Sequence, residues 1–111
     1  MPLYITQGRY TAEALKGMLA KPEDRATAVA ALAEKAGGKL LSYYVTFGEY
    51  DFLVVAEAPD SRAAAAVVLA AGAGGGVTDL KTVEAMTSAQ AKDCFAKAAQ
   101  LAGGFRSAGK D

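Results

Sequence analysis

Two apolar, alternating stretches joined by a glycine-glutamate pair constrain this 111-residue chain more than any other feature. They cover residues 39–47 and 50–57 and are rich in the β-branched and aromatic residues that favour strands. Only Gly48 and Glu49 lie between them, and a glycine in the first of two turn positions favours a type II′ hairpin. The sequence therefore predicts two antiparallel strands whose register is set by a two-residue turn.

This register divides the side chains of the hairpin between two faces of a sheet. The apolar face is expected to pack under helices, and its pairs are Phe47 with Tyr50, Val45 with Phe52, Tyr43 with Val54 and Leu41 with Ala56. The other face is mixed and is expected to be open; its pairs are Thr46 with Asp51, Tyr44 with Leu53, Ser42 with Val55 and Leu40 with Glu57.

The segments around the hairpin predict two more strands and several helices. Pro22 is expected to interrupt the first helical region and to start a new helix, because proline fits best at a first helical position. Gly37 and Gly38 are expected to end that helix. The predicted strands are residues 3–10 and 77–86, and the predicted helices are residues 12–20, 22–36, 62–71 and 87–101.

This order predicts an α+β fold of the ferredoxin-like type, an antiparallel βαββαβ sheet with helices on one face plus a C-terminal helix. We expect a single domain over residues 1–102 and a flexible tail over residues 103–111. An open apolar sheet face favours association. We therefore expect a homodimer or higher homo-oligomer with a cleft between opposed faces and with interface residues Leu40, Tyr44, Leu53 and Val55.

Composition narrows the classes of function. Twelve Lys and Arg residues balance twelve Asp and Glu residues, which disfavours nucleic acid and membrane surfaces as partners. The sequence contains no histidine and no metal-ligand spacing, so we predict no metal site and no cofactor. It also lacks a targeting segment and a long apolar run, which favours a cytoplasmic protein. The single cysteine, Cys94, is interpreted as a buried or half-buried hydrophobic residue.

Three local signatures resemble the GYD-domain family. The first is Tyr10-Thr11 followed by Pro22 and Arg25, and the last is the segment 57–60, Glu-Ala-Pro-Asp. The central one is residues 37–39, Gly-Gly-Lys, leading into residues 44–51, Tyr-Val-Thr-Phe-Gly-Glu-Tyr-Asp. The resemblance implies a ferredoxin-like fold and kinship with dimeric α/β barrels, and it implies no established reaction. The glycine-rich run over residues 72–76 departs from the family pattern; it lacks the features of a phosphate-binding loop, and its role is open.

Asp51 and Arg25 are the most informative candidate site residues. Asp51 is poorly suited to a strand, so it either bonds Thr46 or a backbone amide, or acts as an acid, base or ligand anchor in the cleft. A cation in the first turn of a helix is disfavoured, so Arg25 is expected either to pair with Glu13, Asp24 or Asp51 or to hold an anionic ligand group. The complete set of candidate ligand-binding residues is Tyr4, Thr6, Arg25, Tyr44, Thr46 and Asp51.

The leading interpretation is a small protein that self-associates through its open sheet face and binds a small organic molecule. One alternative is a cofactor-free monooxygenase or isomerase that uses Asp51 with Tyr44 and Arg25. The other is an assembly or regulatory subunit without a pocket. An open cavity on which a carboxylate and a tyrosine converge would favour binding or catalysis over pure assembly.

Overall fold

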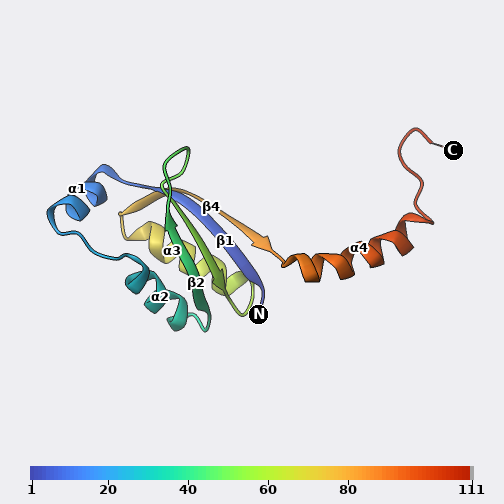
Figure 1. The fold of residues 1–111 in the computed structure, drawn as a ribbon, viewed down its shortest axis with the longest axis horizontal. Coiled ribbons are helices and arrows are strands. Elements are labelled where there is room, and N and C mark those ends of the chain that lie inside the picture. Colours follow the sequence, from blue (N-terminus) through green and yellow to red (C-terminus); the bar gives the residue numbers. More distant parts are fainter. Residues whose placement is uncertain (111) are drawn as a thin grey trace.

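A computed structural model describes residues 1–110 and consists of a four-stranded sheet, three helices beside it and a fourth helix beyond it (Figure 1). The elements are β1 (Leu3–Tyr10), α1 (Ala12–Ala20), α2 (Ala26–Lys35), β2 (Lys39–Val45), β3 (Phe52–Glu57), α3 (Ser61–Ala73), β4 (Val77–Ala85) and α4 (Ser88–Ala102).

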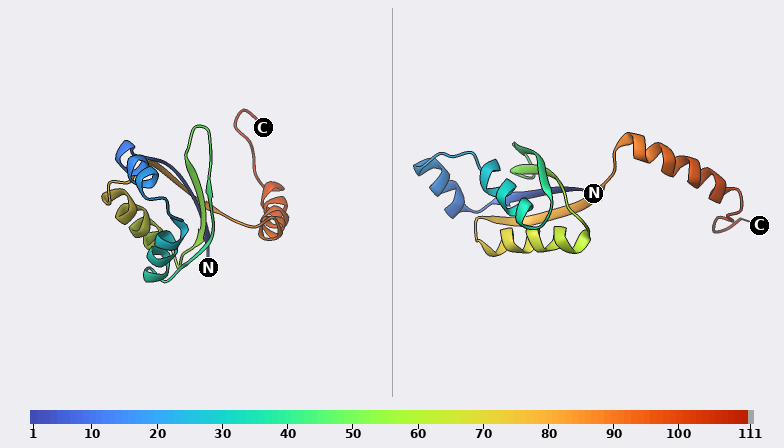
Figure 2. Two further views of the ribbon diagram at one scale, coloured as in Figure 1. Left: turned by 60° about the vertical axis from the view of Figure 1, so that its left-hand side comes forward. Right: turned by 90° about the horizontal axis from the view of Figure 1, so that it is seen from below.

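All strand pairs are antiparallel, and the strand order is β2-β3-β1-β4. Helices α1, α2 and α3 cover one face of this sheet (Figure 2). The predicted ferredoxin-like arrangement with an added C-terminal helix is confirmed. None of the helices within residues 1–110 is both long enough and apolar enough to cross a membrane.

The predicted register of the hairpin is correct near the turn and wrong at the end of the hairpin farthest from the turn. Val45 pairs with Phe52, Tyr43 with Val54 and Ser42 with Val55, as the sequence predicts. A β-bulge between Leu40 and Ser42 then shifts the ladder by one residue, so Leu40 pairs with Ala56 and not with Glu57. Leu40 therefore lies on the helix-covered face, and its prediction as an open-face interface residue is wrong. The bulge also removes Leu41 from the apolar face, leaving its side chain 44% exposed.

The hairpin turn is longer than the sequence predicts. Strand β2 ends at Val45 and β3 begins at Phe52, so the connection spans residues 46–51. Gly48 does not have the positive φ that the first position of a type II′ turn requires. The predicted packing of Phe47 and Tyr50 under the helices is wrong, because Phe47 is 99% exposed and the Tyr50 ring lies under the Arg9 guanidinium, 5.9 Å from the ring centre.

The helical region after β1 breaks at Pro22 as predicted, but the second helix starts later than predicted. Residues 22–24 are not helical, and α2 begins at Ala26, where the Asp24 carboxylate accepts a 2.9 Å hydrogen bond from the Ala26 amide. The short Asp24 side chain can accept a hydrogen bond from the backbone amide two residues later, and this local turn delays the start of the helix. At the other end of α2, Gly37 adopts φ +83°, so the predicted left-handed helix end is confirmed.

Within the described part of the chain, no helix covers the second face of the sheet. Cross-strand partners share a face, so the register places Val55, Ile5 and Val83 in one row, with Leu53 and Tyr44 paired in the next. Helix α4 lies apart from the sheet and extends away from it in Figure 1 and in the right view of Figure 2. No residue of α4 is buried among the described residues 1–110, and Cys94 is exposed, so its interpretation as a buried or half-buried hydrophobic residue is wrong. The predicted tail ends in Asp111, which lies outside the described residues.

Candidate functional site

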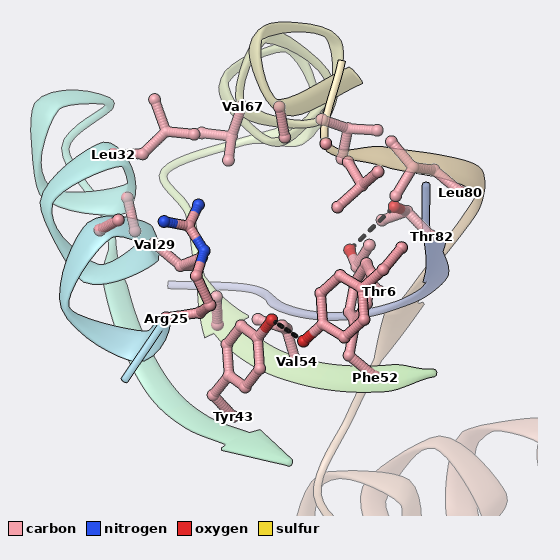
Figure 3. Close-up of a pocket in the computed structure, with 18 of the residues that line it drawn as sticks. Thr6, Arg25, Val29, Leu32, Tyr43, Phe52, Val54, Val67, Leu80 and Thr82 are labelled. Carbon is pink, nitrogen blue, oxygen red and sulfur yellow. Dashed lines mark hydrogen bonds between the residues drawn. The ribbon is translucent and has the colours of Figure 1, made fainter. Parts of the chain in front are cut away.

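A cavity of about 520 Å³ lies between the helix-covered face of the sheet and helices α1, α2 and α3 (Figure 3). This volume falls within the range of about 300–1,000 Å³ that is usual for small-molecule sites. The lining is largely apolar, and its branched members include Val29, Leu32, Val54, Val67 and Leu80. The arrangement can therefore enclose an apolar molecule rather than only a single ion or water.

The cavity results from the small residues on the helices. Alanine carries a single methyl group, so a helix lined with alanines cannot fill the space between itself and a sheet. The cavity-facing alanines come from all three helices and are Ala14, Ala28, Ala33, Ala64 and Ala71. Within residues 1–110, no side chain is less than 2% exposed, which is consistent with a thin core.

Three aromatic rings, those of Tyr10, Tyr43 and Phe52, form one part of the cavity wall on the sheet side. Phe52 is buried, and its ring centre lies 5.2 Å from that of Tyr10 and 6.0 Å from that of Tyr43. Gly8 makes room for this cluster, because a Cβ atom at Gly8 would lie only 2.6 Å from the Phe52 ring. These rings offer an apolar, polarisable surface to a ligand.

The hydroxyl groups of Tyr10 and Tyr43 form a 2.5 Å hydrogen bond at the cavity (Figure 3). Burial, followed by the hydrogen bond with Tyr10, raises the pKa of the Tyr43 phenol above its ordinary value. Tyr43 therefore remains protonated at neutral pH. Whichever hydroxyl donates within the pair, the other retains a hydrogen that it can donate to a ligand.

Arg25 supplies positive charge to the same cavity. Its side chain comes from the N-terminal end of α2, and its guanidinium group extends into the cavity (Figure 3). Its Nη1 atom lies 2.9 Å from the Glu23 carboxylate, so the ion pair predicted with Glu13, Asp24 or Asp51 forms instead with Glu23. The guanidinium group has five N–H donors, and this ion pair occupies one nitrogen. Arg25 can thus pair with an anionic group without losing Glu23.

Tyr4 and Thr6 also line the cavity, and both hydroxyl groups have protein partners. The Tyr4 hydroxyl lies 3.2 Å from Ser61 Oγ and donates to Glu84 Oε1 at 3.2 Å. The Thr6 hydroxyl bonds that of Thr82 at 2.9 Å (Figure 3). Because both hydroxyl groups already have hydrogen-bond partners in the protein, Tyr4 and Thr6 shape the cavity wall more than they offer free donors to a ligand.

The other three predicted ligand residues lie elsewhere. Tyr44 is on the open face and is 59% exposed. The Thr46 hydroxyl donates to the Tyr50 carbonyl at 2.7 Å within the hairpin connection. The Asp51 carboxylate accepts a 2.9 Å hydrogen bond from the Tyr10 amide, which is the backbone contact that the sequence left open. The structure thus brings together Tyr4, Thr6 and Arg25 and separates them from Tyr44, Thr46 and Asp51.

Sequence reasoning did not identify Tyr10, Tyr43 and Phe52 as site residues. The register did place Tyr43 and Phe52 on the helix-covered face, and Tyr10 continues the alternation of Tyr4 and Thr6 along β1. The large number of alanines on the helices that face the sheet was the signal that could have predicted an unfilled space there.

One solved structure with a TM-score of 0.50 supports this fold. The crystal structure of FFRP-DM1 is similar with a TM-score of 0.50 at 19% identity, covering 78% of this chain and 100% of that chain. Two further crystal structures, each covering 78% of this chain, are similar at lower TM-scores. The hypothetical protein PHS023 from Pyrococcus horikoshii has a TM-score of 0.49 at 18% identity over 92% of its chain. TTHA0845 from Thermus thermophilus has a TM-score of 0.48 at 17% identity over 95% of its chain.

A search of curated proteins finds no match. The family model of the GYD domain matches residues 4–95, which include all of the sheet except Leu3, helices α1 to α3 and the first half of α4. The chain therefore belongs to the GYD domain family.

Proposed function

We propose that this GYD-domain protein binds a small, mainly apolar molecule that carries an anionic or hydrogen-bond-accepting group. The observation that carries the proposal is the cavity of about 520 Å³, in which an aromatic wall lies beside one guanidinium group and one tyrosine pair. The apolar part of the ligand would pack on Phe52 and the valine and leucine side chains. Its polar group would accept hydrogen bonds from Arg25 and from the Tyr10–Tyr43 pair.

Binding is favoured over catalysis by the protonation and the positions of the polar groups. The raised pKa of Tyr43 makes it a hydrogen-bond donor and a poor base at neutral pH. Within one chain, Asp51 bonds the Tyr10 amide and Tyr44 lies on the opposite face, so neither joins Arg25 at the cavity. A monooxygenase or isomerase using these three residues therefore finds less support than a binding protein.

The binding proposal can be tested with 8-anilinonaphthalene-1-sulfonate, an aromatic sulfonate whose fluorescence rises in apolar surroundings. We expect wild-type protein to bind this probe and Arg25→Met to bind it about tenfold more weakly, a loss expected for one charge-assisted contact. N-phenyl-1-naphthylamine has the same rings without the sulfonate, and its affinity should change little in Arg25→Met. Arg62→Met is the matched control, since Arg62 is exposed at the start of α3.

A probe of this kind can also bind exposed apolar surface, so the cavity needs its own control. Val67 projects into the cavity from α3 (Figure 3). Val67→Phe should fill part of the space and weaken both probes. Binding that is unchanged in Val67→Phe and in Arg25→Met would place the probe outside the cavity and refute the proposal.

We further propose that the protein self-associates through the open sheet face. Ile5, Val55 and Val83 form an apolar row there, and Val83 is 46% exposed in the single chain. Val55→Lys should therefore lower the molecular mass measured by light scattering. An unchanged mass in a folded variant would refute this second proposal.

A further inference from the structure

Helix α4 is an amphipathic helix that is not buried against any other element within residues 1–110. None of residues 88–102 is buried in a neighbouring element, and Phe95 and Leu101 are 73% and 68% exposed. Its apolar stripe, defined by residues Ala91, Cys94, Phe95, Ala98 and Leu101, recurs at helical spacing. Fifteen residues give a helix about 22 Å long, enough to cross a four-stranded sheet.

Local signals start α4, but they do not explain its apolar stripe. Thr87 and Gln90 form a capping box in which the Gln90 amide donates to Thr87 Oγ1 at 3.1 Å and the Thr87 amide donates to Gln90 Oε1 at 2.9 Å. A solitary helix of this length is marginal in water, because most helical stability in proteins comes from packing an apolar face. The stripe of α4 therefore requires a surface to pack against.

The open sheet face is also apolar and uncovered, so it matches the apolar stripe of α4. Its apolar row of Ile5, Val55 and Val83 runs across the three strands β3, β1 and β4, with Leu53 in the adjacent row. A helix lying across these rows would bury both apolar surfaces at once. Direct contact of two bare sheets would cover the strands and leave the stripes of both α4 helices in water.

The total surface of the chain is large enough to form a stable dimer. Its accessible area of 7961 Å² exceeds by about 2,200 Å² the roughly 5,700 Å² expected for a compact monomer of 11.3 kDa. Its radius of gyration is 18.1 Å, whereas a compact domain of this length has about 13 Å. If each of two copies buries half of this excess area, about 1,100 Å², the interface buries about 2,200 Å² in total, which is within the range of obligate homodimers.

We infer that α4 of each copy packs across the open sheet face of a second copy, in a reciprocal dimer with two-fold symmetry. This inference rests on the proposed self-association and adds α4 to the interface between the two copies. The occupant is a second copy because only Met86 and Thr87 separate β4 from α4. Thr87 is fixed by the capping box and Met86 contacts Cys94 through sulfur at 3.7 Å, an arrangement that directs α4 away from its own sheet (Figure 1).

The first test is native mass spectrometry of the full-length chain with one lysine placed on either side of α4. Phe95→Lys puts a charge into the stripe and should reduce the mass from twice 11.3 kDa to 11.3 kDa. Gln100→Lys adds the same charge on the opposite side of the helix and should leave the dimer intact. Because Phe95 is exposed in the single chain, the substitution does not disturb the sheet or its helices.

The outcomes separate this inference from the proposed self-association. A dimer that is lost in Val55→Lys but persists in Phe95→Lys would overturn the role of α4 and leave association through the sheet standing. Equal dissociation in Phe95→Lys and Gln100→Lys would also overturn the role of the stripe. A monomeric wild-type protein would overturn both proposals.

The second test uses Cys94, the only cysteine in the sequence, as a built-in probe on the stripe. The variants Ile5→Cys, Val55→Cys and Val83→Cys, made one at a time, sample the apolar row of the open face. Under mild oxidation we expect at least one variant to form a disulfide between Cys94 of one chain and the new cysteine of another. A bond between two new cysteines would indicate opposed sheets, and a bond within one chain would indicate that α4 folds back; either result would overturn the inference.

Discussion

The carboxylate of Asp51 accepts a 2.9 Å hydrogen bond from the backbone amide of Tyr10, which joins the start of β3 to the end of β1. The Asp51 amide also donates to the Gly8 carbonyl at 2.8 Å. The aspartate of the family's central motif therefore holds Tyr10, a residue of the cavity wall, in place. Its role in the single chain is to position backbone rather than to meet a ligand.

Asp51→Ala should lower the free energy of unfolding by about 1–2 kcal/mol, because the partly buried Tyr10 amide would lose its acceptor. Asp51→Asn keeps an oxygen acceptor and should cost less than about 1 kcal/mol. Urea denaturation of both variants provides the measurement, with Asp93→Asn on exposed α4 as the control. Equal losses in the alanine and asparagine variants would indicate that the charge matters more than the acceptor.

Gly38 and Gly48 should respond in opposite ways to the same substitution. A Cβ atom at Gly38 would lie 2.1 Å from the Glu57 carbonyl oxygen, so Gly38→Ala must displace backbone at the base of the hairpin. We expect a loss of about 1–3 kcal/mol or more. A Cβ atom at Gly48 would meet no heavy atom within 4 Å, and Gly48 has no positive φ, so Gly48→Ala should be neutral or stabilise by about 0.4–1 kcal/mol. Thermal denaturation compares the stability of the two variants. A severe loss of stability in Gly48→Ala would instead support the type II′ turn predicted from the sequence.

Tyr43 should make the protein less stable at alkaline pH. Its pKa is raised in the folded protein, so its contribution is fully present below about pH 10, the ordinary pKa of tyrosine. Above that pH the unfolded chain loses the proton while the folded chain keeps it, and the free energy of unfolding falls as pH rises. Tyr43→Phe should flatten this decline, whereas Tyr44→Phe on the open face should not. Parallel alkaline profiles for wild type and Tyr43→Phe, obtained from urea denaturation, would contradict the assignment.

Filling the cavity should stabilise the protein in the absence of a ligand. Val67→Phe adds ring atoms where the alanines of the helices leave space, and cavity-filling substitutions commonly add about 0.5–2 kcal/mol. Differential scanning calorimetry should show a higher Tm for this variant. Val67→Ala is the matched opposite change and should lower the Tm, because it enlarges the same space. A lower Tm in both variants would show that the space around Val67 is already closed to a ring.

The apolar alternation and the glycine positions of the sequence determined most of the fold. Strand and helix periodicity located β1, α1 and the core of the hairpin, and Gly37 ended α2 in a left-handed conformation. These features are local, because they depend on residues that are neighbours in sequence and on backbone geometry. The pairing of Val45 with Phe52 and of Tyr43 with Val54 followed from the same local pattern.

Only the tertiary structure decided which residues share a site. The bulge at Leu41 moved Leu40 to the helix-covered face, and no pattern within the strand distinguishes a bulged residue from a paired one. The position of Arg25 beside Tyr43 depends on how α2 packs over β2, and the cavity depends on methyl groups from three helices facing one sheet. The sequence contains the apolar stripe of α4, but its lack of a partner within the chain became visible only in three dimensions, since burial is a property of packed surfaces and not of residue order.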